Sequence, residues 1–215
     1  PLVMMSVRRN SSEVDTTLVN LLTHYGYSAY RLVPGLGVLE PFVSPDQLDA
    51  MALNLFCCKE DRAEKLETQG KLLRRVYPLS DLPGLGVRAW QDNLALQPYA
   101  SNQVVPWEES MSRYTDWERY WVALNLFAHA KDPRRSARER SSSLTGSYSI
   151  MVMLANKGAV TLPRLFTLVR VLTEIGKREV AVTVLNQICA TMAKGAFELD
   201  EPFLVLATQN PIEQE

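Results

Sequence analysis

The stretch YSAYRLVPGLGVLEPFV, residues 27–43, decides the fold of the first part of the chain. Residues 27–33 are rich in Tyr and Val, which predicts a strand. Pro34-Gly35-Leu36-Gly37 turns the chain, and residues 38–43 extend again. The stretch therefore predicts an antiparallel hairpin at the edge of a sheet.

The residues before this hairpin predict one more strand and one helix. The apolar run 2–8 (LVMMSVR) is a strand candidate, and Ser11, Ser12 and Asp15 offer helix N-cap chemistry. Apolar residues recur at helical spacing from Val14 to Tyr25, and Gly26 is expected to end that helix. The order predicts a parallel βα unit followed by the hairpin, that is, an α/β segment.

Helical signals dominate from Ser44 onward. Ser44-Pro45-Asp46 is typical of a helix start, and residues 60–69 predict a charged helix ended by Gly70. The expected apolar stripe of the first of these helices is Leu48, Met51, Ala52, Leu55 and Phe56. Residues 74–106 contain several prolines and predict an ordered linker with a short helix near Trp90.

The second half predicts a mostly α-helical hairpin domain over residues 107–200. Asp132-Pro133, Gly158, Gly176 and Gly195 are the expected breaks between helices. The helices are expected at 107–130, 134–156, 162–175 and 177–192. Short breaks indicate stacked antiparallel hairpins, and the last hairpin resembles a tetratricopeptide-type (TPR-like) unit.

Composition excludes several classes of protein. The 215 residues carry a formal net charge of −1, which favours neither a nucleic-acid partner nor an anionic membrane surface. Apolar runs fall short of the ~20 residues of a membrane helix. The three cysteines, Cys57, Cys58 and Cys189, suit a reduced compartment, so we expect a cytoplasmic protein. The chain opens and closes in apolar, strand-like sequence, which predicts a piece of a longer protein.

Candidate glycine loops and metal ligands favour structural roles. Gly35-Leu36-Gly37 and Gly84-Leu85-Gly86 lack the third glycine of a dinucleotide fingerprint and are interpreted as turns. His24 and His129 are far apart in sequence, and zinc needs three or four converging ligands, so no metal site is predicted. Cys57 and Cys58 are expected on different sides of a helix, and His24 is expected to suit a helix C-terminus.

Two further clusters also have structural explanations. A phosphate site at Arg134, Arg135, Arg138 and Arg140 is the alternative to a solvated first turn of a helix, which we favour. Trp107, Trp117, Tyr120 and Trp121 have the spacing of a helix core. Nucleophile motifs such as Gly-x-Ser-x-Gly are missing from the sequence, so catalytic residues stay unknown.

Four strings within residues 1–73 carry a resemblance to a known family. PLVMMSVRRN, a helix ending in YGY, SAYRLVPGLGVLEPF and LNLFCCKEDRAEKL follow one another. This succession resembles the closing segment of FkbM-family methyltransferases, with strings such as LVMFEIK, LGY, YRLVPGL and NLFACK. The resemblance implies the end of a Rossmann-like sheet. It also implies a parent enzyme that uses S-adenosylmethionine to methylate hydroxyl oxygens of small molecules or sugars.

The same resemblance assigns no site residue to this chain. Ser6 stands where the family strand usually carries Glu. The glycine-rich cofactor loop and the ribose-binding acidic residue of the family would lie upstream of residue 1. We therefore expect a methyltransferase fragment that is inactive alone because the cofactor-binding half is absent.

The tail, residues 201–215, carries a second resemblance. FLVLATQNPIEQE, residues 203–215, is similar to the sensor-1 strand and loop of MoxR-type AAA+ ATPases. The resemblance implies a nucleotide-sensing role for Asn210, which would polarise the attacking water. A nucleotide site also needs a Gly-x-x-x-x-Gly-Lys-Ser/Thr loop and an acidic pair for magnesium, and the sequence has neither.

Three functional hypotheses remain at this point. The first is the methyltransferase fragment, and the second is a helical protein-interaction module. In the second, helices within residues 107–194 would present a groove to a peptide or a partner subunit. The third is a fragment of an AAA+ ATPase, which depends on the tail alone.

Overall fold

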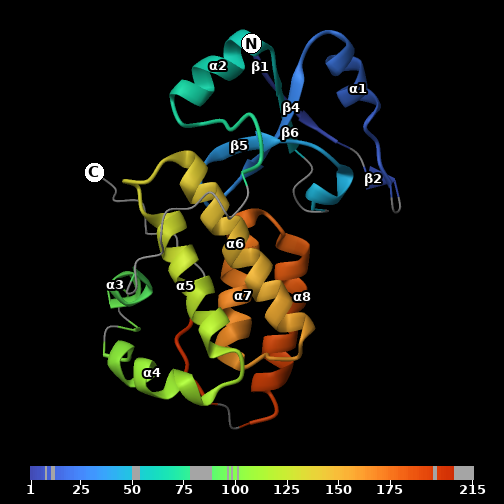
Figure 1. Cartoon of the computed structure of the whole chain (residues 1–215). Helices are drawn as coiled ribbons and strands as arrows, with labels where there is room; N and C mark the ends of the chain where they lie inside the picture. Colours follow the sequence, from blue (N-terminus) through green and yellow to red (C-terminus); the bar gives the residue numbers. More distant parts are fainter. Residues whose placement is uncertain are drawn as a thin grey trace, which may run out of the picture.

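The computed structural model places a small antiparallel sheet at one end of a set of packed helices (Figure 1). It describes residues 1–7, 9–10, 13–49, 54–77, 89–95, 97, 99–100, 102–195 and 198–205. We call the described part of residues 1–73 the sheet unit and residues 104–195 the helical unit. The predicted α/β start and mostly helical remainder are confirmed at this level.

The sheet has the strand order β1-β6-β4-β5, and every paired neighbour is antiparallel. The strands are β1 (Leu2–Ser6), β4 (Ser28–Val33), β5 (Val38–Pro41) and β6 (Asn54–Cys58). A separate two-stranded ribbon pairs β2 (Arg9–Asn10) with β3 (Glu13–Val14). The predicted strand at 2–8 and the predicted hairpin of β4 and β5 are confirmed.

The prediction of a helix after Ser44 is wrong. Within the described residues, Pro45–Gln47 is a short 3-10 turn, η1, and Asn54–Cys58 is the strand β6. Both faces of β6 are covered, so its apolar residues run on without polar interruption, as they would in a buried helix. Cys57 and Cys58 do lie on opposite sides of their element, but that element is a strand and not a helix.

The strands of the predicted parallel βα unit are parallel in direction but are not neighbours in the sheet. β1 and β4 run in the same direction, but β6 lies between them and pairs with both. Helices α1 (Thr17–His24) and α2 (Glu60–Thr68) cover opposite faces of this sheet (Figure 1). Val19 packs against the Cys57 side, and Leu66 packs against the Cys58 side. Gly26 and Gly70 follow these helices with positive φ, as predicted.

The helical unit confirms the predicted hairpins. Its consecutive helices α5, α6, α7 and α8 pack as neighbours along the long axis of the molecule (Figure 1). The bounds are α4 (Val104–Ser110), α5 (Trp117–Lys131), α6 (Ala137–Asn156), α7 (Leu162–Ile175) and α8 (Arg178–Met192). The predicted short helix near Trp90 is α3 (Ala89–Ala95), which packs on α5.

The prediction of a single helix from Trp107 to Ala130 is wrong. The chain breaks after α4 through the 3-10 turn η3 (Met111–Arg113), and α5 begins at Trp117. Asp116 before α5 has φ 56°, a left-handed conformation that Asp tolerates better than most residues. The break leaves the Thr115 carbonyl free to accept a hydrogen bond from Arg164, which a continuous helix would have used internally.

The sheet unit docks on the carboxyl end of α7. The Gly35 amide donates to the Glu174 carbonyl at 2.8 Å, and Lys131 Nζ donates to the Gly35 carbonyl at 2.8 Å. Arg31 pairs with buried Glu40 at 2.8 Å and also donates to the Ile175 carbonyl. Apolar residues of the turn and its strands join the main core of the helical unit: Val33, Leu36 and Val38. Across the described ranges, helices long and apolar enough to span a membrane are not found.

Candidate functional site

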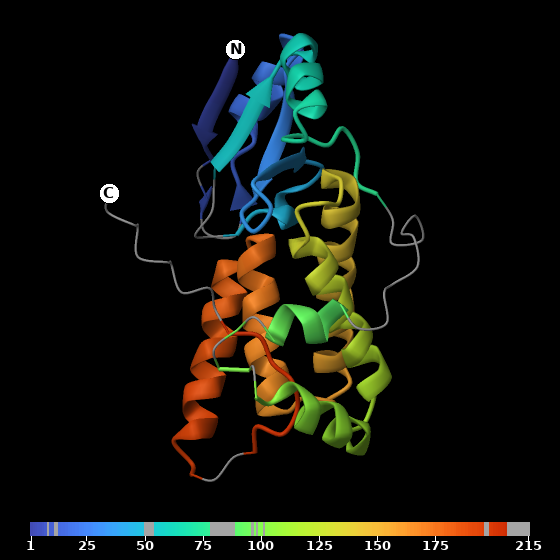
Figure 2. The same ribbon diagram turned by 90° about the vertical axis from the view of Figure 1, so that its left-hand side faces the viewer.

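The most distinctive site in the described part of the molecule is an irregular segment, residues 198–205, that lies against α4, α5 and α7. Figure 2 shows this segment in red, running beside the helices after the chain leaves α8. Glu201, Pro202 and Leu204 are buried, although the segment belongs to no helix or strand. We call the surface that receives it the groove, formed by Tyr99, α4, Tyr114, α5 and α7.

A carboxylate pocket holds the centre of the segment. Arg164 Nε and Nη2 donate to Glu201 Oε1 at 3.0 and 2.7 Å, and Thr161 Oγ1 donates to Glu201 Oε2. Glu201 is 0% and Arg164 2% exposed, so both charges are fully removed from water. Arg164 Nη1 donates to the carbonyls of Thr115 and Ala159 at 2.8 and 3.0 Å. A buried charge pair needs such additional hydrogen bonds to offset the cost of desolvation.

Helix ends position the pocket. Thr161 is the N-cap of α7, and its hydroxyl accepts the Arg164 amide at 3.4 Å. The Arg164 side chain therefore projects from the first turn of α7. It lies beside the break before α5, where the Thr115 carbonyl is available. Its guanidinium lies 5.0 Å from the Tyr120 ring centroid, within cation–π range. The pocket is thus built from two helix starts.

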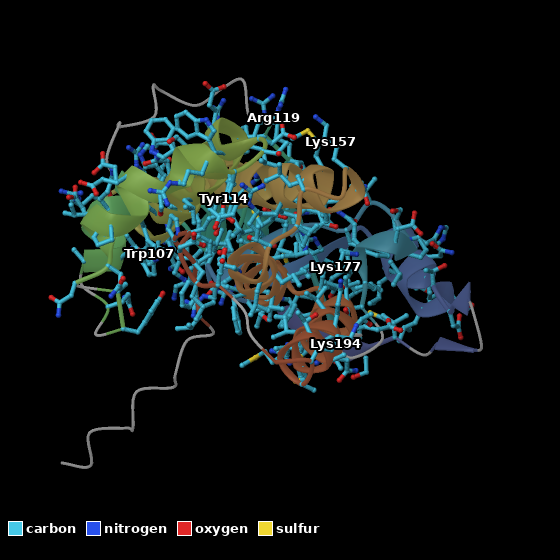
Figure 3. The ribbon with its side chains drawn as sticks, turned by 90° about the horizontal axis from the view of Figure 1, so that it is seen from below. Trp107, Tyr114, Arg119, Lys157, Lys177 and Lys194 are labelled. Atoms are coloured by element: carbon cyan, nitrogen blue, oxygen red, sulfur yellow. The ribbon has the colours of Figure 1, made fainter. Side chains whose placement is uncertain are left out.

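Side chains of the groove also bind the backbone of the segment. Trp107 Nε1 donates to the Leu199 carbonyl at 3.0 Å, and the Tyr99 hydroxyl donates to the Phe203 carbonyl at 2.9 Å. Ser110 donates to the Asp200 carbonyl, and Arg170 Nη1 donates to the Val205 carbonyl at 3.1 Å. Trp107 and Tyr114 are labelled in Figure 3, which views the molecule from the groove end. These contacts are made to carbonyl oxygens of the segment, so they do not depend on the side chains of the segment.

Hydrogen bonds to the two residues next to Phe203 hold the chain there, one at the Leu204 amide and one at the Pro202 carbonyl. The Leu204 amide donates to Thr167 Oγ1 at 3.1 Å, and Tyr120 OH donates to the Pro202 carbonyl. Tyr120 OH and Thr167 Oγ1 are 2.8 Å apart. A carbonyl can only accept, so the single Tyr120 proton goes to Pro202, and Thr167 donates to the Tyr120 oxygen. Burial raises the pKa of Tyr120 well above its usual range, which keeps this donor protonated.

The Phe203 ring lies among three aromatic rings of the groove. Its centroid is 5.4 Å from those of Tyr99 and Trp107, and 5.6 Å from that of Phe166. Beside it, Tyr114 hydrogen-bonds Asp200, and burial together with that carboxylate raises the Tyr114 pKa. The aromatic residues flagged in the sequence thus pack as predicted, but Trp107 and Tyr120 also carry polar contacts to the segment.

The histidines and cysteines do not form a site. His24 ends α1 as predicted and is exposed, whereas His129 is buried in α5 of the helical unit. Cys57 and Cys58 are buried and free, and burial raises the pKa of both thiols. Cys189 is free and exposed on α8. Within the described ranges, clusters of three or more His, Cys, Asp or Glu suited to a metal ion are not found.

The basic cluster at the start of α6 is engaged with neighbouring groups. Arg134 bonds Asp132 at 2.9 Å, and Arg140 Nε donates to the Ala130 carbonyl at 3.0 Å. Arg138 stacks on the Tyr77 ring, with the guanidinium 4.2 Å from its centroid. The helix itself begins at Ala137 after the N-cap Ser136, so the predicted start at Arg134 is three residues early. These contacts favour the structural role over a phosphate site.

A cavity of about 500 Å³ lies beside this cluster and is the main alternative site. Its lining includes Asp92, His129, Lys131 and Asp132. Burial lowers the pKa of His129, helped by nearby Arg135, but Lys131 is bonded to Gly35 and Glu174. We favour the groove as the functional site, because its polar side chains converge on a single segment of the chain.

The tail prediction lies partly outside the described residues. Asn210 and Gly84-Leu85-Gly86 fall there, and the structure says nothing of them. Residues 201–205 form no strand: the chain bends at Glu201, and the segment lies against helices. Arg164 and Glu201 carry no sequence signal, because one Arg inside a helix and one Glu before Pro form no recognisable motif. Comparison with known proteins finds no match among family models, curated proteins or solved structures.

Proposed function

We propose that the helical unit is a protein-interaction module whose groove binds an extended peptide segment. One observation carries the proposal: residues 198–205, which belong to no helix or strand, already occupy the groove and are held by side chains of Tyr99, α4, α5 and α7. Stacked helical hairpins commonly offer such concave binding surfaces. The described residues contain binding chemistry in this groove and no comparable arrangement of catalytic groups.

The nature of the contacts supports binding of a chain. Five carbonyl oxygens of the segment accept hydrogen bonds from groove side chains, those of Leu199, Asp200, Pro202, Phe203 and Val205. The segment belongs to no helix or strand, so its buried carbonyl oxygens need donors from elsewhere in the molecule. Here side chains of the groove donate to the backbone carbonyls of the segment, as the side chains of a peptide receptor do to a bound peptide.

A cut chain tests this proposal. A protease recognition sequence placed between Gly195 and Glu198 allows the folded full-length chain to be cleaved there. A fluorescent peptide with the sequence of residues 198–205, ELDEPFLV, is then added in excess. We expect it to exchange into the cleaved protein, seen as a rise in anisotropy, and not into the uncut one. An intramolecular segment has an effective concentration of order millimolar and excludes the probe. Failure of the probe to enter the cleaved protein would contradict the proposal.

The methyltransferase origin is the second candidate, and the sheet unit favours it. The four strings of the resemblance fall on β1, α1, β4, β5, β6 and α2, which form one sheet with a helix on each face. In this proposal the sheet unit closes a Rossmann-like sheet, and β1 is an edge strand where further strands can pair. S-adenosylmethionine and the small-molecule or sugar acceptor would bind residues outside this chain. A reduced, cytoplasmic compartment agrees with the three free cysteines.

Calorimetry with S-adenosylmethionine tests the second candidate. We expect binding to this chain no tighter than millimolar, since the resemblance assigns no cofactor-binding residue to it. Micromolar binding would show that the cofactor site lies within these residues and would contradict the fragment hypothesis.

A further inference from the structure

We infer that the groove selects peptides of the form Glu-Pro-aromatic-Leu and that residues 201–204 are a resident competitor for such a partner. This inference rests on the proposed function and adds the chemistry of the partner. It also adds regulation, because a groove filled from within the chain must be vacated before a partner binds.

The first requirement is a carboxylate at the position of Glu201. Arg164 is 2% exposed, and its Nε and Nη2 groups, which face the segment, donate hydrogen bonds only to Glu201. A peptide without a carboxylate there would leave a buried guanidinium unpaired, which is strongly unfavourable. Thr161 Oγ1 binds the second carboxylate oxygen, so the pocket matches both oxygens. Asp200 is half-buried and accepts a hydrogen bond from Tyr114, without the arginine that pairs with Glu201, and Glu198 is exposed.

The second requirement is proline after the glutamate. Pro202 is buried, and its carbonyl accepts the Tyr120 proton. Proline has no amide N–H, so a single donor to its carbonyl oxygen satisfies the whole backbone of this buried residue. Another residue at this position would bring an additional N–H into the buried site. Proline also fixes φ and lowers the entropy lost when the peptide becomes ordered.

The third requirement is an aromatic residue followed by leucine. The rings of Tyr99, Trp107 and Phe166 lie 5.4 to 5.6 Å from the Phe203 centroid. Aromatic pairs at such separations gain energy beyond simple burial. Leu204 is 6% exposed and belongs to the main core of the helical unit. The pattern is therefore acidic, then proline, then two apolar side chains of defined shape.

Competition follows from the short connection to α8. The helix ends at Met192 and the bound segment begins near residue 198, so the tether is a few residues long. Such a tether keeps the local concentration of the segment far above that of a free partner. A partner with several copies of the pattern, or a change that weakens Glu201, would then be needed to open the groove.

Competition binding on the cleaved protein tests the selectivity. Unlabelled peptides displace the fluorescent ELDEPFLV probe, and their inhibition constants are compared. We expect Glu201→Gln in the peptide to weaken binding about 30-fold or more, since it leaves Arg164 buried without a charge partner. Pro202→Ala and Phe203→Ala should each weaken binding several-fold. Glu198→Gln is the matched control and should compete within about twofold of the parent, because Glu198 is exposed.

A second measurement uses the uncut chain and tests the competitor role. The Glu201→Gln chain, never cleaved, is expected to bind the parent probe, because its own segment is weakened while the groove keeps Arg164. The Glu198→Gln chain should exclude the probe as the unmodified chain does. Equal competition by the Glu201→Gln and parent peptides would overturn the inference and leave the proposed function standing. No binding of any peptide to the cleaved protein would overturn both.

Discussion

Two segments from outside the helical hairpins dock on α7, and they do so in different ways. The Pro34–Gly37 turn lies against the carboxyl end of the helix, where a backbone hydrogen bond joins Gly35 to Glu174. The 198–205 segment lies along its amino-terminal half, where Arg164 and Thr167 hold it by charge and by directed hydrogen bonds. The first contact depends on close approach of two backbones, and the second on polar side chains of the helix.

A chain of polar contacts joins the two docking regions. Arg170 binds the Val205 carbonyl and also Glu174 at 2.7 Å, and Glu174 binds Lys131 at 2.9 Å. Lys131 in turn donates to the Gly35 carbonyl. The difference between the regions shows that one helix holds the sheet unit through backbone contact at one end and the 198–205 segment through side chains at the other, the end that we propose as a receptor.

The largest effect is expected at the buried charge pair. Glu201→Gln removes the partner of Arg164, and breaking one side of a buried pair costs about 3 to 5 kcal/mol. The open state of the segment should become correspondingly more populated. Native-state proteolysis within residues 198–205 should therefore accelerate by about two to three orders of magnitude. Glu198→Gln serves as the control, and an unchanged cleavage rate for Glu201→Gln would contradict the account of the groove.

The next effect is expected at the turn. A Cβ at position 35 would lie 1.8 Å from Glu174 Oε2 and 2.7 Å from Glu174 Cβ. Gly35→Ala should therefore separate the two backbones and lower the free energy of unfolding by about 2 to 3 kcal/mol in urea. The cleavage rate within residues 198–205 should change far less than in Glu201→Gln. A fully stable Gly35→Ala protein would show that the turn does not dock as described.

A smaller effect is expected from Thr167→Val, which keeps the side-chain shape. It removes the acceptor of the Leu204 amide and the donor to Tyr120. Leaving a buried amide unsatisfied costs about 1 to 2 kcal/mol. Proteolysis of the segment should accelerate about tenfold, whereas Thr183→Val, on exposed α8 surface, is the matched control. No acceleration would mean that the Leu204 amide is satisfied in another way.

The smallest effect concerns pH and the cavity near the turn. Burial lowers the pKa of His129, so below about pH 6.5 the unfolded chain binds a proton that the folded chain does not. Stability should therefore fall as the pH falls below this value, with a slope of at most about 1.4 kcal/mol per pH unit. Urea unfolding of His129→Gln should lose this slope, and His24→Gln should keep it because His129 is still present. A slope that survives in His129→Gln would assign it to other groups.

The sequence predicts the elements of the fold better than their pairing. Glycines with positive φ after α1, α2 and α7 end these helices where the sequence places the breaks. The β4–β5 hairpin follows from its turn residues. The strand β6 is missed because Leu55 and Phe56 fit a helical stripe as well as a strand buried on both faces. Such a choice is made by the partner strands, which the local pattern does not contain.

The groove could not be predicted from the sequence for a related reason. Arg164 and Glu201 are 37 residues apart, and nothing local marks either as a member of a pair. Trp107 and Tyr120 were recognised as core residues, but their polar atoms reach a segment far along the chain. The acidic residue before Pro202 is the only local sign, and its meaning depends on the three-dimensional position of α7.

Native-state hydrogen exchange tests the central claim most directly, through the Leu204 amide. This amide is held by Thr167, whereas amides near Leu124 and Leu172 lie in the cores of α5 and α7. If the segment is a bound peptide, Leu204 exchanges through a local opening whose free energy is clearly below that of the α5 and α7 amides. If Leu204 exchanges only with global unfolding, the segment is an inseparable part of the core and the account is contradicted.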